Sequence, residues 1–306
     1  MNSKDKITAK IIADSISPEG VRMTTMEIEY PRFILAELNT HRMLSKNSAS
    51  SRAIPVKAMH EFIDNSPAEP VYWGKNQAGM QAKTEIGPHE LEEAKYIWMK
   101  AKEDALHWSG ALAGRLEVHK QIANRITEPW MTMKTVISGT EWRNFWWLRC
   151  HADAQPEINV LAQKMFELYQ QHQPQQLQPG EWHVPYVLTR RDHRDNLHYL
   201  DSNDVSISAT EARIVSASCC AQVSYRKNDD TLEKATKIYR QLIESEPAHA
   251  SPVEHQATPM YPGVDEYAPE AWQPGTTHVS ARGDLWSGNL RGWIQHRKLI
   301  NGEARW

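Results

Sequence analysis

The segment from His41 to Arg52 concentrates side chains that bind anions. It contains two arginines, one histidine and four serines, and it follows a short apolar stretch. Arginine guanidinium groups bind phosphates through paired hydrogen bonds, and serine hydroxyls and free backbone N–H groups near a helix end supply further donors. Composition alone fits an ordinary solvated helix end equally well. An anion-binding site is therefore one of two interpretations of this segment taken by itself.

Two local patterns must position this segment. Alternating residues between Ile7 and Met26 flank the turn sequence Ser17–Gly20, which predicts a β-hairpin. Apolar residues between Phe33 and Leu38 then crowd one helical face and predict a helix that runs into the anion-binding segment. We therefore expect the polar cluster to lie at a helix end.

Helical periodicity recurs farther along the chain. It predicts a long helix from about His89 to Ile122, a second around Phe145–Arg149 and a third over Ile158–Leu168. The small apolar run Ile214–Tyr225 predicts a buried strand, and a helical stripe follows between Thr231 and Glu246. These patterns indicate a mixed α and β fold.

Length and charge limit the functional classes. The 306 residues, 40% of them hydrophobic, suffice for one elaborated domain. A net charge of -3 lacks the basic footprint of a duplex-binding protein. Three cysteines form neither a disulfide framework nor a zinc-ligand pattern, which fits a reducing cytoplasm. No apolar run approaches the roughly 20 residues of a membrane span, and the first residues do not resemble a secretion signal.

The order of residues in the anion-binding segment resembles the signature of flavin-dependent thymidylate synthases. That signature is Arg-His-Arg, two variable residues, Ser, one variable residue, Asn-Glu, one variable residue, Ser, one variable residue and Arg. The matching residues here are His41, Arg42, Ser45, Asn47, Ser50 and Arg52. Thr40 replaces the first arginine and Ser48 replaces the glutamate, so some flavin or nucleotide contacts must differ.

Two further blocks carry the same resemblance. Asn144–Arg149 followed by Asp153–Ile158 is similar to the family stretch whose arginine binds the pyrimidine ring, which implies that role for Arg149. Gln121–Arg125 is similar to the family's Glu-x-Ala-Arg, whose arginine holds the nucleotide phosphate. Arg125 is displaced from that arginine by one position.

A third family block lies far downstream of its expected place. Val223–Tyr225 and His249–His255 resemble an Arg-Val-Ser-Tyr strand end and a His-x-Thr/Ser-Pro-x-Glu-His segment that should precede the arginine signature. A circular permutation explains this order, because domain termini often lie close together. We therefore expect one catalytic domain, residues 1–306, with the relocated block at about 208–258, in a divergent member of a phage-like type.

The resemblance implies an α/β (α+β) fold with a mixed or antiparallel sheet and long helices, assembled as a homotetramer. It implies FAD as cofactor, NADPH as reductant and methylenetetrahydrofolate as one-carbon donor, with dUMP or dCMP as substrate. Catalysis would rest on Arg149 and Asn144, and no metal is expected. Its implied cofactor-binding residues are His41, Arg42, Ser45, Asn47, His249, Ser251 and Glu254, and its implied substrate-binding residues are Glu37, Ser50, Arg52, Arg125 and Arg149.

Two alternative functions remain open. The nearest is a dUMP or dCMP hydroxymethylase, and Glu37, where the family has glutamine, raises the question of the base because a carboxylate accepts a hydrogen bond from the cytosine amine. A more distant one is a non-catalytic nucleotide- or single-strand-binding module that uses arginines and aromatic platforms. The spacing of His249, Glu254 and His255 also suggests a metal site, although Pro252 argues against the helix such motifs need.

Overall fold

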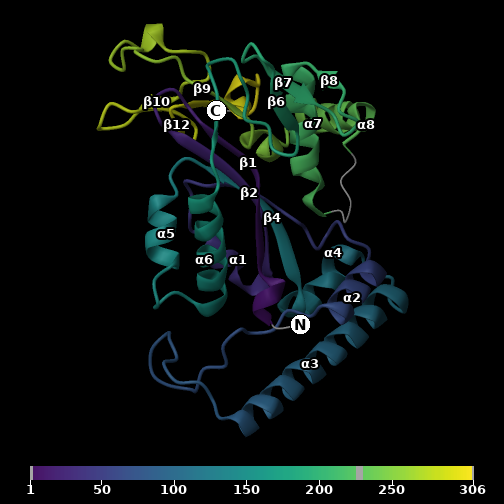
Figure 1. The fold of residues 1–306 in the computed structure, drawn as a ribbon. Helices are drawn as coiled ribbons and strands as arrows, with labels where there is room; N and C mark the ends of the chain where they lie inside the picture. The colour runs from purple at the N-terminus through teal and green to yellow at the C-terminus, as the bar shows by residue number, and fades with distance from the viewer. Residues whose placement is uncertain (1–2, 225–229, 305–306) are drawn as a thin grey trace.

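A five-stranded mixed sheet forms the centre of the computed structural model, which describes residues 3–224 and 230–304 (Figure 1). Its strands are β1 (Thr8–Ile16), β2 (Arg22–Pro31), β3 (Ser45–Ser48), β4 (Thr132–Gly139) and β5 (Gln175–Gln176). They lie in the order β3-β4-β2-β1-β5, and only the β1–β5 pair is parallel. The expected hairpin around Ser17–Gly20 is confirmed as β1 and β2.

Two helices pack on one face of this sheet, α5 (Arg143–Arg149) and α6 (Pro156–Gln171) (Figure 1). Alternate residues of β2, namely Met26, Ile28 and Tyr30, point into this layer because successive strand residues face opposite sides. They pack with α6 and with Phe145 in the largest apolar cluster of the described residues. This packing fixes α5, which carries the predicted catalytic residues.

The opposite face carries buried polar groups joined in one hydrogen-bonded chain. His183 Nε2 and Ser138 Oγ lie 2.8 and 2.6 Å from Thr25 Oγ1, and Ser138 Oγ lies 2.8 Å from His255 Nδ1. His183 Nδ1 lies 2.8 Å from Ser15 Oγ. These bonds offset the cost of burying polar groups. Two helices and a small sheet stand beyond this face: α7 (Ala209–Ala221), α8 (Leu232–Ile243), β6 (Leu188–Arg191), β7 (Leu197–Leu200) and β8 (Ser206–Ile207).

The remaining elements lie at the two ends of the central sheet (Figure 1). The signature segment is preceded by η2 (Arg32–Ile34) and α1 (Leu35–Asn39). The helices at one end are α2 (Val56–Asn65), α3 (Pro88–Gly114), α4 (Lys120–Ala123) and η3 (Asn124–Trp130). The C-terminal part contains η5 (Ser251–Glu254), β9 (Ala257–Pro259), β10 (His278–Val279), β11 (Leu285–Ser287), β12 (Leu290–Arg291), β13 (Trp293–Gln295) and η7 (His296–Leu299).

The fold class predicted from the sequence is confirmed, but two local predictions are wrong. The run predicted as a strand over Ile214–Tyr225 is helix α7, and Tyr225 lies outside the described residues. A capping box between Ser208 and Glu211 starts this helix, and its small side chains allow close packing on several sides. The long helix α3 ends at Gly114, and Glu117 then has a φ of 52°. A residue in the left-handed region cannot continue a right-handed helix.

Within the described ranges, no helix is both long and apolar enough to span a membrane. The same residues contain no group of three or more His, Cys, Asp or Glu side chains arranged to hold a metal ion. The spacing of His249, Glu254 and His255 therefore does not produce such a cluster there.

Candidate active site

The signature segment and α5 meet through Arg149. Its Nε donates a hydrogen bond to His41 Nε2 over 2.8 Å, and its Nη2 donates to Thr40 Oγ1 over 3.1 Å. A longer bond of 3.4 Å runs from Nη2 to the Glu37 carbonyl. The His41 ring stands edge-on to Phe145, with centroids 4.8 Å apart. The helix end at Thr40 and the last turn of α5 therefore form one polar centre.

The His41 ring is held neutral in this centre. Burial, then the positive charges of Arg149 and Lys46, lower its pKa from 6.5 to about 4. Because Nε2 accepts the hydrogen bond from Arg149, the remaining ring proton is assigned to Nδ1. A neutral His41 can thus orient the guanidinium group without repelling it.

A cavity of about 890 Å³ opens beside this pair. The loop Thr40–Leu44 lines one side and α5 the other, so His41, Arg42 and Asn144 face the same space. Arg143 also lines it, and sequence analysis did not identify this residue although it directly precedes Asn144. The cavity therefore brings together one predicted catalytic residue, Asn144, and two predicted cofactor-binding residues, His41 and Arg42.

Strand β3 joins the signature to the downstream segment 208–258. Asn47 Nδ2 donates to the Cys220 carbonyl at the end of α7, and Ser251 Oγ donates to Asn47 Oδ1 over 3.3 Å. Ser45 Oγ bonds to the amide of Asn289, at 3.2 and 3.0 Å from its Oδ1 and Nδ2 atoms. Segments more than 200 residues apart in sequence therefore share this edge strand.

Lys46 is a second residue that sequence analysis missed, although it lies inside the signature. Its Nζ donates to the carbonyls of His41 and Leu44. Burial lowers its pKa from 10.5 to about 8, and the negative charge of Glu254 opposes that shift. Glu254 itself forms an ion pair with Arg297. Two of the predicted cofactor residues, Ser251 and Glu254, thus interact with the signature.

The other predicted residues lie apart from the cavity beside His41. His249 is exposed, and its backbone N–H bonds to Leu242. Ser50 and Arg52 follow β3, and neither lines that cavity. Arg125 is half exposed and forms an ion pair with Glu128 at 3.0 Å. Glu128 also pairs with Arg32 at 3.0 Å.

Glu37 adjoins the Arg149 centre, because its backbone carbonyl accepts the longer bond from Arg149 Nη2. Its Oε2 atom is buried and has no hydrogen-bond partner among the described residues. Burial raises the pKa of the nearby Glu157, and the charge of Glu37 adds to that rise. An enclosed carboxylate oxygen without a donor is unfavourable in the free protein.

Comparisons with known proteins identify the family to which the chain belongs. The family model of the thymidylate synthase complementing protein matches residues 17–175, which is more than half of the chain. A search among curated proteins finds no match. Similar solved structures include the UMP/dUMP methylase PolB from Streptomyces cacaoi bound with 5-Br UMP. It has a TM-score of 0.46 and 16% identity over 53% of this chain and 88% of that one.

A second similar structure is thymidylate synthase X from Helicobacter pylori with FAD and dUMP. Its TM-score is 0.33 at 18% identity, over 48% of this chain and 66% of that one. The family match includes both His41 and Arg149, whereas residues 208–258 and the C-terminal strands lie beyond it. On the strength of that match, the chain belongs to the thymidylate synthase complementing protein family and is an enzyme of the flavin-dependent thymidylate synthase type.

Proposed function

We propose that this protein transfers a one-carbon unit from methylenetetrahydrofolate to C5 of dUMP and produces dTMP in a flavin-dependent reaction. The observation that carries the proposal is the hydrogen bond between Arg149 and His41 within the family-matched residues. His41, which accepts this bond from Arg149, lines a cavity of about 890 Å³, large enough for a nucleotide or a cofactor portion.

The donor set fits FAD. Arg42 lines the cavity, and its guanidinium group has no hydrogen bond or ion pair among the described residues. A guanidinium group suits a diphosphate, which accepts paired charge-assisted hydrogen bonds. Arg42 and His41, with Ser45, Asn47, Ser251 and Glu254 around β3, would hold FAD. His249 belongs to the same proposed set. The bound flavin would supply the redox chemistry, with NADPH as reductant.

Arg149 would stabilise the pyrimidine as C5 becomes nucleophilic. Its Nε and Nη2 atoms are engaged by the protein, which leaves Nη1 without a partner among the described residues. A donor already fixed in place stabilises developing negative charge without reorganisation. Asn144, five residues earlier on α5, would orient the same ring. Ser50, Arg52 and Arg125 would hold the nucleotide phosphate, and Glu37 would contact the base.

We also propose that residues 1–306 act as a single catalytic domain, with the block at 208–258 relocated by circular permutation. The contacts of Asn47 with Cys220 and Ser251 support this proposal, because they attach that block to the signature strand. The enzyme would be a cytoplasmic homotetramer, and light scattering of the purified protein measures the assembly directly.

Product mass tests the proposed reaction. Purified protein would be incubated with FAD, NADPH, methylenetetrahydrofolate and either dUMP or dCMP. Formation of dTMP from dUMP is the expected result. A product heavier than the methylated nucleotide by one oxygen atom would identify a hydroxymethylase. If neither nucleotide gives a product and the protein does not bind FAD, the protein is a binding module. Including dCMP is justified by the unpartnered Glu37 oxygen, which suits an exocyclic amine.

A further inference from the structure

Three arginines from separate segments converge on the cavity beside His41. Arg42 follows α1, Arg143 begins α5, and Arg282 belongs to the turn between β10 and β11. All three are exposed, and none has a side-chain hydrogen bond or ion pair among residues 3–224 and 230–304. Glu141 is the acidic residue in the lining, and Arg291 already engages its Oε1 at 2.7 Å. The cavity therefore carries uncompensated positive charge.

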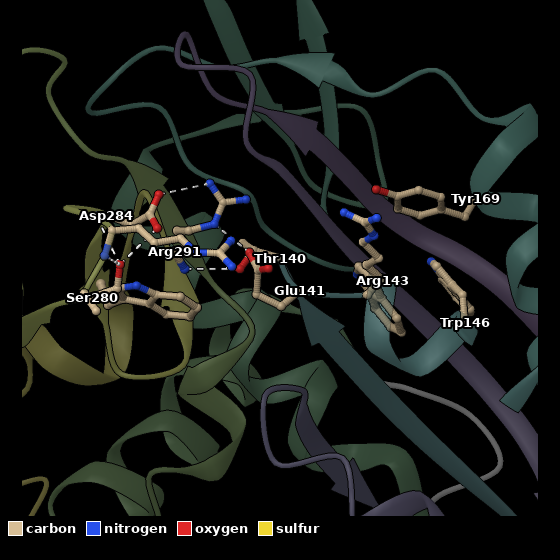
Figure 2. A pocket seen from close by; sticks show the side chains of 12 residues that line it. Thr140, Glu141, Arg143, Trp146, Tyr169, Ser280, Asp284 and Arg291 are labelled. Atoms are coloured by element: carbon tan, nitrogen blue, oxygen red, sulfur yellow. Dashed lines mark hydrogen bonds and ion pairs between the residues drawn. The ribbon is translucent and has the colours of Figure 1, made fainter. Parts of the chain in front are cut away.

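The turn that carries Arg282 is fixed to the body of the protein. The backbone N–H of Arg291 donates to Thr140 Oγ1 over 3.1 Å, and its Nε donates to Glu141. Asp284 lies 3.7 Å from Arg291 Nη1 and accepts a 3.0 Å hydrogen bond from Ser280. Figure 2 shows these residues gathered at Thr140 and Glu141, across from the α5 side. These contacts hold Arg282 at the cavity instead of leaving it on a free loop.

An aromatic compartment adjoins the arginines. A second cavity, of about 820 Å³, shares Glu141, Arg143 and Arg282 with the first. Its other lining residues include four aromatic side chains, Trp142, Trp146, Tyr169 and Trp286. Figure 2 shows Arg143, Trp146 and Tyr169 together on its α5–α6 side. The indole N–H of Trp286 is enclosed and has no partner among the described residues.

We propose that the turn Ser280–Trp286 completes a binding site that the family-matched residues do not contain by themselves. In this site Arg282, with Arg42 and Arg143, binds a phosphate or carboxylate group, and the ligand's planar ring lies against the aromatic compartment. A nucleotide cofactor has this chemistry in its phosphates and its base, and a folate has it in its glutamate carboxylates and its pterin ring. The identity of the ligand rests on the proposed function, whereas the anion site rests on the arginines alone.

The test compares Arg282→Ala with wild type and with Arg115→Ala. Arg115 is also an exposed arginine; it follows the C-terminal end of α3 and lines neither cavity. Calorimetric titrations at low salt would use pyrophosphate, FAD, dUMP and a triglutamylated tetrahydrofolate. We expect Arg282→Ala to weaken pyrophosphate and one of the three larger ligands by about 10- to 100-fold, the loss of one charge-assisted contact. Arg115→Ala should bind all four like wild type.

The larger ligand that loses affinity identifies the source of the anionic group. If Arg282→Ala loses affinity for FAD or dUMP, the group that Arg282 binds is a phosphate. If it loses affinity for the folate, that group is a carboxylate of the glutamate tail. Wild-type protein that fails to bind pyrophosphate, or an Arg282→Ala variant within twofold of wild type for every probe, overturns the site. An Arg282-dependent affinity for pyrophosphate in a protein that never converts dUMP would instead refute the proposed reaction and leave the anion site standing.

Discussion

The Nε atom of Arg149 donates a 2.8 Å hydrogen bond to Nε2 of His41, a residue 108 positions earlier in the chain. The bond requires an imidazole that accepts at Nε2, and the lowered pKa of His41 keeps the ring neutral at physiological pH. Thr40 contributes a second acceptor in the position where the family signature has an arginine. Thr40 thus replaces the cation of the family signature with a hydroxyl group that accepts a hydrogen bond from Arg149.

Replacing Arg149 with alanine should lower kcat for dUMP by about 100- to 1,000-fold, the range for removing a preorganised donor. FAD affinity should remain within a few-fold of wild type, because Arg149 is assigned to the pyrimidine. His41→Gln retains an acceptor for Arg149 and should keep more activity than His41→Leu. Steady-state kinetics and flavin titration measure both quantities. Equal activity in the two His41 variants would exclude positioning of Arg149 by residue 41.

Replacing Arg42 with alanine should weaken FAD binding by about 10- to 100-fold, which corresponds to roughly 1.5 to 3 kcal/mol for one contact to a charged group. Folding should be unaffected, since the Arg42 side chain is exposed and unpaired among the described residues. Fluorescence titration of flavin measures the affinity, with Arg115→Ala as a matched control. An unchanged titration curve for Arg42→Ala would remove this residue from the flavin site.

Replacing Glu37 with glutamine tests which base the enzyme selects. If Glu37 reads a cytosine amine, the substitution should shift the ratio of kcat/KM for dUMP and dCMP by more than about tenfold towards dUMP. No arginine neutralises the Glu37 carboxylate in the described residues, because Arg32 pairs with Glu128 and the Glu37 Oε2 atom is unpartnered. The same ratio before and after substitution would show that Glu37 does not contact the base.

The buried histidines predict loss of stability in mild acid. Burial lowers the pKa of His183 to about 4, and burial together with the nearby His183 lowers that of His255 to about 3. In the unfolded chain both imidazoles have a pKa of about 6.5. Below that pH the unfolded state therefore binds protons that the folded state does not bind. The stability that depends on the neutral state of these two histidines is therefore fully present above about pH 6.5, and it is lost as the pH falls towards about 4.

At pH 5 each fully buried histidine should cost about 2 kcal/mol of unfolding free energy relative to neutral pH. Urea unfolding at pH 7.5 and pH 5 measures this difference. His183→Gln removes one titrating group. The loss of unfolding free energy between pH 7.5 and pH 5 should therefore be smaller in this variant than in wild type, by about 2 kcal/mol. A variant with the full wild-type pH dependence would contradict the assignment of His183 as a neutral buried group.

The sequence by itself determined the features that depend on neighbouring residues. Alternation on either side of Ser17–Gly20 specified the hairpin, and helical spacing specified α5 and α6, because these periodicities are local. The ordered motifs around His41 and Arg149 indicated the family that the comparison confirmed. The strand predicted from the local pattern at α7 was wrong, because a short run of small apolar residues suits a buried strand as well as a buried helix. The capping box at Ser208 and Glu211 was the local signal that favoured a helix.

Only the tertiary structure decided which of these residues meet. The contact between Asn47 and Ser251 joins positions 204 residues apart, and no periodic pattern encodes such a pairing. The same holds for Arg282, which lies far beyond the signature yet lines the cavity beside His41. Whether an arginine is paired or available to a ligand depends on which acids the folded chain brings within reach. That outcome is set by the pairing of strands and the packing of distant segments, so it becomes visible only in the folded protein.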